Sequence, residues 1–221
     1  MLGALAYLFG DPNAAPGELT RLLRLLDVQA EQSVPTYFSV LNLLFSAILI
    51  LVIYKNIRLM GQAGAAYWLL LALIFLGLSF DESASLHEKL GKLQEILVQR
   101  DIMPPILETH RWLPFGVAFV IAVGVVFFPF LRNLPRDTLA YFLFSGFIFI
   151  TGAIGFEFLG AVMLKTGFVS SKSEPIYLLR RIFEEGFEMY GIACFNCALY
   201  REISIRQIVL EIRSDSEIRR Q

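Results

Sequence analysis

Acidic residues and one histidine gather where three apolar segments of the sequence begin or end. Carboxylate oxygens and a neutral imidazole nitrogen are the donors that a hard or borderline divalent cation needs. The same groups without a metal ion would suit proton relay, because burial and mutual repulsion hold protons on carboxyl groups. Sequence alone does not separate the two chemistries. The candidate ligands are Asp81, Glu82, His87, Glu88, Glu157, Glu184 and Glu188.

Two of these acids lie inside apolar segments. With Lys165 taken as the end of its segment, Glu157 lies about 12 Å deep at the rise of an α-helix. Glu188 follows Arg181 by seven residues, which places it about 10 Å deep. Ionisable residues within a membrane span indicate a functional site by default, and no basic residue lies within a turn of Glu157.

The composition indicates a polytopic membrane protein. Of the 221 residues, 56% are hydrophobic and 18% are charged, against about 45–50% and about 25% in ordinary soluble domains. A chain of this size has too little interior to bury its long apolar runs, and a membrane span needs about 17–25 such residues. We therefore expect an all-α transmembrane bundle of about five spans, with interfacial amphipathic helices. The predicted spans are 37–54, 65–80, 112–131, 139–164 and 182–200.

Alternation of the spans brings the acidic groups together. Successive spans run in opposite directions, so 65–80 and 139–164 end at the membrane face where 182–200 begins. The three groups therefore share one face in either orientation of the protein.

Amphipathic segments flank the bundle. Leucines recur at helical spacing over 19–26 and 86–97, and the tail after residue 200 has the same character, which is typical of interfacial helices. We divide the chain into an N-terminal segment (1–36), the bundle (37–200) and a charged tail (201–221). Short loops with basic residues favour an N-out, C-in orientation.

Several classes of function are excluded. A net charge of −1 gives no nucleic-acid surface. Ala84 stands three residues before His87, where a ferritin-like di-metal site needs Glu, and two histidines cannot form a three-histidine zinc site. Nucleotide-binding and serine-hydrolase motifs are absent from the sequence. Whether the protein is an enzyme stays open.

Simpler explanations exist for part of the cluster. Glu184 and Glu185 each follow an arginine by four residues and could form interfacial ion pairs with Arg180 and Arg181. The acidic residues around His87 could simply lie at a helix end that is exposed to water.

Outside the cluster, the sequence assigns packing roles to other polar and small residues. Glu108 and His110 lie on the cluster's side of the membrane and could contribute to it, although a solvated loop suits them better. Asn42 fits a hydrogen bond to a neighbouring helix. Gly152, Gly155 and Gly160 predict a close contact between helices.

Two motifs resemble those of a group of bacterial polytopic membrane proteins. They are Leu78-Ser-Phe-Asp-Glu-Ser-Ala-Ser-Leu-His-Glu88 and Glu184-Glu-Gly-Phe-Glu-Met-Tyr-Gly191, and the entry Val34-Pro-Thr-Tyr-Phe38 is also similar. The resemblance covers about Asp27 to Tyr200. Members of the group often have a further span upstream, of which Met1–Phe9 resembles the end. The resemblance implies architecture and no particular reaction.

We therefore expect an integral protein of the bacterial inner membrane with a cation-handling site at one face. A divalent metal ion is the possible cofactor, membrane lipids are the expected partners, and other membrane subunits are possible ones. The alternative is a non-catalytic accessory or scaffold subunit, in which the acids only hold helices together. A proton-coupled carrier is weakened by the lack of internal repeats.

Overall fold

The computed structural model describes residues 33–102 and 110–208, except for the side chains of Glu88 and Gln94. All regular elements in these residues are helical, which confirms the all-α prediction. The helices are α3 (Val34–Leu59), α4 (Ala65–Ala84), α5 (Leu86–Gln99), α6 (Leu113–Arg132), α7 (Arg136–Ile150), the π-helix η1 (Thr151–Phe156), α8 (Glu157–Lys165) and α9 (Pro175–Ile205). The expected amphipathic segment 19–26 and the tail beyond 208 lie outside the described residues.

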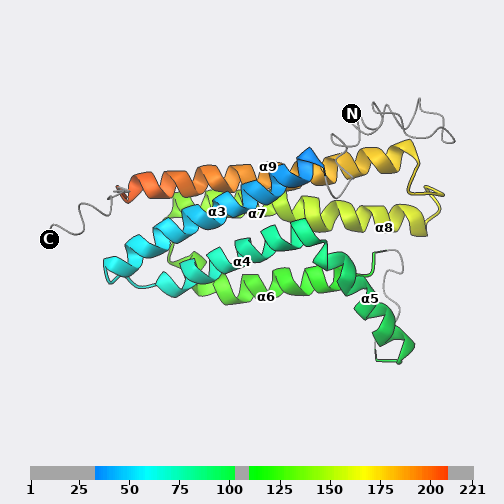
Figure 1. The fold of residues 1–221 in the computed structure, drawn as a ribbon, viewed down its shortest axis with the longest axis horizontal. Coiled ribbons are helices and arrows are strands. Elements are labelled where there is room, and N and C mark those ends of the chain that lie inside the picture. The colour runs from blue at the N-terminus through cyan, green and yellow to red at the C-terminus, as the bar shows by residue number, and fades with distance from the viewer. Residues whose placement is uncertain (1–32, 103–109, 209–221) are drawn as a thin grey trace, which may run out of the picture.

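Four helices are long and apolar enough to cross a membrane: α3, α4, α6 and the continuous helix Arg136–Lys165. Each matches a predicted span. The fifth predicted span lies in α9, whose 31 residues extend about 46 Å. Helix α9 lies beside α3 and α7 (Figure 1), but its first half is rich in Arg and Glu. A fifth membrane crossing therefore stays a prediction.

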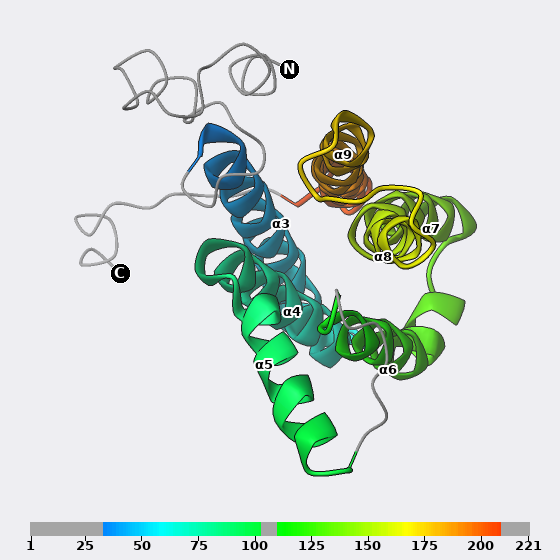
Figure 2. The ribbon, with the colours of Figure 1, turned by 90° about the vertical axis from the view of Figure 1, so that its right-hand side faces the viewer.

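The long helices are arranged in a ring when the bundle is viewed end on. In Figure 2, α3, α4, α6, the α7–α8 helix and α9 follow one another around it, and α5 points away from it. Leu86, Leu90 and Leu93 of α5 are exposed, as expected for a helix that buries its leucines in the membrane interface.

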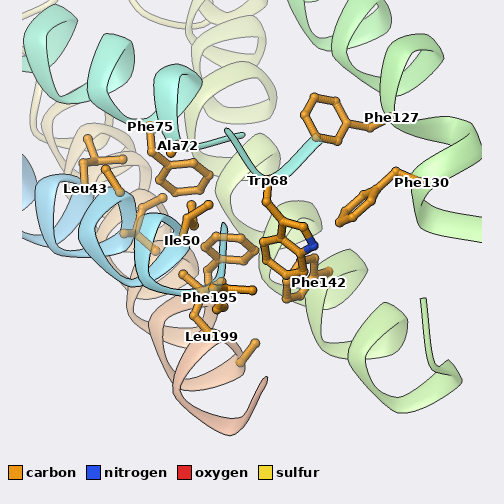
Figure 3. Close-up of a cluster of buried hydrophobic side chains, with 14 of the residues drawn as sticks. Leu43, Ile50, Trp68, Ala72, Phe75, Phe127, Phe130, Phe142, Phe195 and Leu199 are labelled. Carbon is orange, nitrogen blue, oxygen red and sulfur yellow. The ribbon is translucent and has the colours of Figure 1, made fainter. Parts of the chain in front are cut away.

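Aromatic side chains fill the half of the bundle away from the acidic residues. The Trp68 ring meets Phe130 edge-on at 5.3 Å between centroids, and Phe75 stacks on Phe195 at 4.8 Å (Figure 3). These contacts join α4, α6 and α9, and each such pair contributes about 0.5–1.5 kcal/mol beyond burial.

Hydrogen bonds between side chains join α3 to α9 next to this core. The Asn196 amide donates to Asn42 Oδ1 at 2.6 Å, and Ser46 Oγ donates to Asn196 Oδ1 at 2.7 Å. The predicted hydrogen bond of Asn42 to a neighbouring helix is confirmed.

The helix after span 65–80 does not continue straight, and Asp81 and Glu88 therefore do not share one face of a single helix. Ser85 adopts a left-handed conformation (φ 48°), which ends α4 and turns α5 away. The Asp81 carboxylate accepts the His87 backbone N–H at 2.7 Å and so caps the first turn of α5.

Glycines allow η1 and α8 to lie directly against α9. A Cβ atom on Gly152 would lie 2.8 Å from Glu188 Cγ, and one on Gly160 would lie 2.9 Å from Arg180 Cζ. The close contact predicted from these two glycines is confirmed. The prediction is wrong for Gly155, where an added Cβ would meet only Thr151 of the same helix, at 3.6 Å.

Candidate functional site

A cavity of about 700 Å³ occupies the end of the bundle opposite the aromatic core. The first part of α3, the end of α4, the start of α6, the α7–η1–α8 junction and the first half of α9 line it. Six of the seven predicted site residues reach it, whereas the side chain of Glu88 lies outside the described part of the chain. The six are Asp81, Glu82, His87, Glu157, Glu184 and Glu188.

Arg180 lies at the centre of the buried charges. Its guanidinium group contacts Glu184 Oε2 at 2.7 Å and Glu157 Oε2 at 3.6 Å, and it donates to the Phe156 carbonyl. The three charged side chains are 4–15% exposed, so they are largely shielded from water. The Arg180–Glu184 pair suggested by spacing therefore forms, but within the bundle and not on its surface.

The carboxyl groups of Glu157 and Glu184 therefore share one guanidinium group. With both carboxyl groups ionised, the trio with Arg180 has a charge of −1, and binding of one proton makes the trio neutral.

An unexpected histidine completes the surroundings of Glu157. His110 is 3% exposed, and its Nε2 lies 3.2 Å from the Tyr177 hydroxyl and 3.7 Å from Glu157 Oε1. The Trp112 indole donates to the same Oε1 atom at 3.1 Å. The expectation that His110 belongs to a solvated loop is therefore wrong, and Glu108 lies outside the described residues.

Burial lowers the pKa of His110 below its ordinary value, because the charged imidazolium loses its hydration. The Glu157 carboxylate opposes this effect, whereas Lys172, Arg180 and Arg181 add to it. His110 is therefore a neutral imidazole at pH 7, able to accept or donate one hydrogen bond at each nitrogen according to its tautomer.

A second pair borders the same cavity. Asp81 Oδ2 lies 2.9 Å from His87 Nδ1, and the His87 ring meets the Trp112 ring edge-on at 5.0 Å between centroids. Trp112 thus stands between the Asp81–His87 pair and Glu157. Both side chains of the pair are about one-third exposed, so this part of the cavity is wetter.

Glu188 differs from the other acids. It lines the cavity next to Gly152, and its carboxylate makes no hydrogen bond or ion pair with any described residue. Its largest electrostatic interactions are with other carboxylates, those of Glu82, Glu157, Glu184 and Glu185.

The sequence analysis did not include Trp112, Tyr177 and Arg180 among the site residues, and it considered His110 only as a less favoured contributor. The signal for Arg180 was its spacing from Glu184, but a sequence pattern does not show whether an ion pair is buried. No local signal joins His110 to Tyr177, which lies 67 positions further along the chain.

The carboxylates and histidines are metal-ligating residue types, but they do not converge as a ligand set. Within residues 33–102 and 110–208, no three His, Cys, Asp or Glu side chains are grouped so as to hold a metal ion. Arg180 lies against both Glu157 and Glu184, where a metal ion would have to replace it.

Residues 1–202 match the model of a family described as a domain of unknown function, DUF8692. No curated protein and no solved structure matches the chain. The family match agrees with the expected membership of a family without an assigned activity. Since it covers nearly the whole sequence, the chain belongs to the DUF8692 family.

Proposed function

We propose that the protein binds and exchanges protons in this cavity, with Glu157 and Glu184 as the proton-holding pair. The observation that carries the proposal is that two largely buried carboxyl groups share the single guanidinium group of Arg180. One proton separates the neutral trio from the trio with a charge of −1. Because the site is shielded from water, a change of one charge alters the binding free energy of any charged ligand in the cavity.

The exchange takes place with one side of the membrane. The lining residues come from one end of the bundle, and the aromatic cluster around Trp68 and Phe195 fills the other end. The site is therefore an acid–base centre open to one face, and we do not expect the protein to conduct protons across a bilayer.

A divalent metal ion is the alternative cation. It would have to draw Glu157 and Glu184 away from Arg180 and gather Glu188 or the Asp81–His87 pair as further donors. The arrangement favours the proton, because Arg180 already contacts both carboxyl groups and balances one of their two negative charges.

Infrared difference spectroscopy tests the proposal. Spectra of the protein in lipid nanodiscs, recorded between two pH values, should contain a signal from carboxyl protonation that is lost in Glu157→Gln and in Glu184→Gln. Glu202→Gln is the matched control, because Glu202 is also buried on α9 but lies at the opposite end beside Thr138 and Arg206.

An unchanged carboxyl signal in both site variants would refute the proposal. Elemental analysis of the same preparations, purified without chelators, separates the alternatives. Near-stoichiometric metal in the wild type that is lost in Glu157→Gln would establish the metal site. Absence of both the metal and the signal would favour an accessory subunit in which the acids are structural.

A further inference from the structure

The cavity is much larger than a proton site requires. A water molecule occupies about 30 Å³ in the liquid, whereas pockets for small organic ligands measure about 300–1,000 Å³. At about 700 Å³ the cavity falls within the second range. Its size therefore indicates an organic ligand in addition to exchangeable protons.

The wall of the cavity has two chemical halves. Phe119 and Val120 of α6, Phe149 and Ile150 of α7, and Ile154 of η1 supply an apolar surface. The acids of α4 and α9 supply a polar one. A small hydrated cation would leave the apolar surface against water, whereas a hydrocarbon chain would cover it.

Five basic side chains line the described cavity, and Arg181 is the partly exposed one among them that stands in no ion pair with a described residue: Lys92, Arg111, Lys172, Arg180 and Arg181. Arg180 contacts Glu157 and Glu184, and Arg111 contacts Glu95 at 2.6 Å. Lys92 and Lys172 are exposed.

Glu188 is a carboxylate of this cavity that makes no hydrogen bond or ion pair with any described residue. It is partly exposed, and a carboxylate held away from bulk water is stabilised by a cation or by hydrogen-bond donors. An ammonium group supplies one positive charge and three donors, which are the groups that Glu188 lacks.

We propose that the cavity binds an amphiphile with a primary-amine headgroup, which contacts Glu188 while its hydrocarbon chain lies along the apolar surface of α6, α7 and η1. The amphiphile uses the same cavity as the proposed proton exchange but a different carboxylate. Either proposal can therefore fail while the other holds.

Trp112 provides the readout, because it lines the cavity and the chain contains only one other tryptophan, Trp68, in the aromatic core. In a Trp68→Phe background, verified by circular dichroism, a long-chain alkylamine brominated on its chain is titrated in a nonionic detergent. We expect saturable quenching of Trp112. A brominated alkyl phosphate of equal length and a short brominated amine should quench far less.

Glu188→Gln should weaken the binding of the alkylamine about tenfold or more, because a hydrogen bond to a charged group contributes about 1.5–3 kcal/mol. Glu202→Gln should bind like the parent. Competition supplies a test that needs no site variant: unbrominated alkylamine should restore the fluorescence, and an alcohol of the same chain length should not.

Three results would overturn the inference. They are stronger quenching by the phosphate, equal quenching by the short amine, and equal displacement by the alcohol. Unchanged affinity in a folded Glu188→Gln protein would also reject it, since the alkylamine would then only partition into the micelle.

Discussion

Among the ion-paired side chains of the bundle, we expect Arg180 to be the one whose substitution lowers the unfolding free energy most. Substitution Arg180→Met keeps most of the side-chain volume and removes the charge between Glu157 and Glu184. Both carboxyl groups are 12–15% exposed in the structure, so water replaces the lost partner poorly. Removing one partner of a buried ion pair costs about 3–5 kcal/mol, and we expect a loss of unfolding free energy in this range at neutral pH.

The matched control is Arg201→Met on the same helix. Arg201 pairs with Asp137 at 3.0 Å, but the two side chains are 37% and 76% exposed. An exposed pair contributes about 0–1 kcal/mol. Unfolding in detergent mixed with increasing mole fractions of a denaturing surfactant, followed by circular dichroism, gives the two free energies on one scale.

A double-mutant cycle isolates the cause. In a Glu184→Gln background one of the two stranded charges is already absent, so Arg180→Met should cost less there. The coupling should be within about 0.5–3 kcal/mol. Equal losses for Arg180→Met and Arg201→Met, or a coupling of zero, would show that the buried trio does not stabilise the protein.

Two further predictions concern packing and pH. Gly152→Ala places a Cβ atom 2.9 Å from the backbone carbonyl oxygen of Glu184 and should destabilise the protein by about 1–3 kcal/mol in the same unfolding assay, whereas Gly146→Ala, with no atom within 4 Å of the added carbon, should not. Equal effects of the two substitutions would contradict the proposed contact. Burial lowers the pKa of His110 in the folded protein, so the unfolded chain binds this proton more readily and stability should fall as the pH drops below about 6.5. His110→Gln should show a smaller acid-induced loss, and an unchanged pH profile would reject the assignment.

The clustering of the acids could be predicted because it depends only on topology. Alternating spans place the ends of 65–80 and 139–164 and the start of 182–200 at one end of the bundle, whatever the packing between them. The structure brings the six described acidic and histidine side chains to one cavity. Their chemical role was left open by the sequence and is still a proposal.

The local geometry could not be predicted, because it depends on tertiary contacts. The leucine pattern after residue 85 fits both a continuation of the preceding helix and the start of a new one. Only the left-handed Ser85 and the Asp81 cap decide in favour of a restart. Likewise, nothing in the local sequence pattern distinguishes the π-helix η1 from an ordinary α-helix, although η1 directly precedes Glu157.

Helix α9 itself shows which buried carboxylates are structural. At its far end, Glu202 is 2% exposed, and both of its oxygens have partners, the Thr138 hydroxyl at 2.8 Å and Arg206 Nε at 2.7 Å. A ligand would not stabilise such a carboxylate further, because Arg206 already balances the charge and both oxygens already accept hydrogen bonds. Glu188, on the same helix, lines a cavity with neither kind of partner among the described residues. Glu188 is partly exposed in the cavity and has no such partners in the described part of the chain, so its charge and its lone pairs stay available to the proposed ligand.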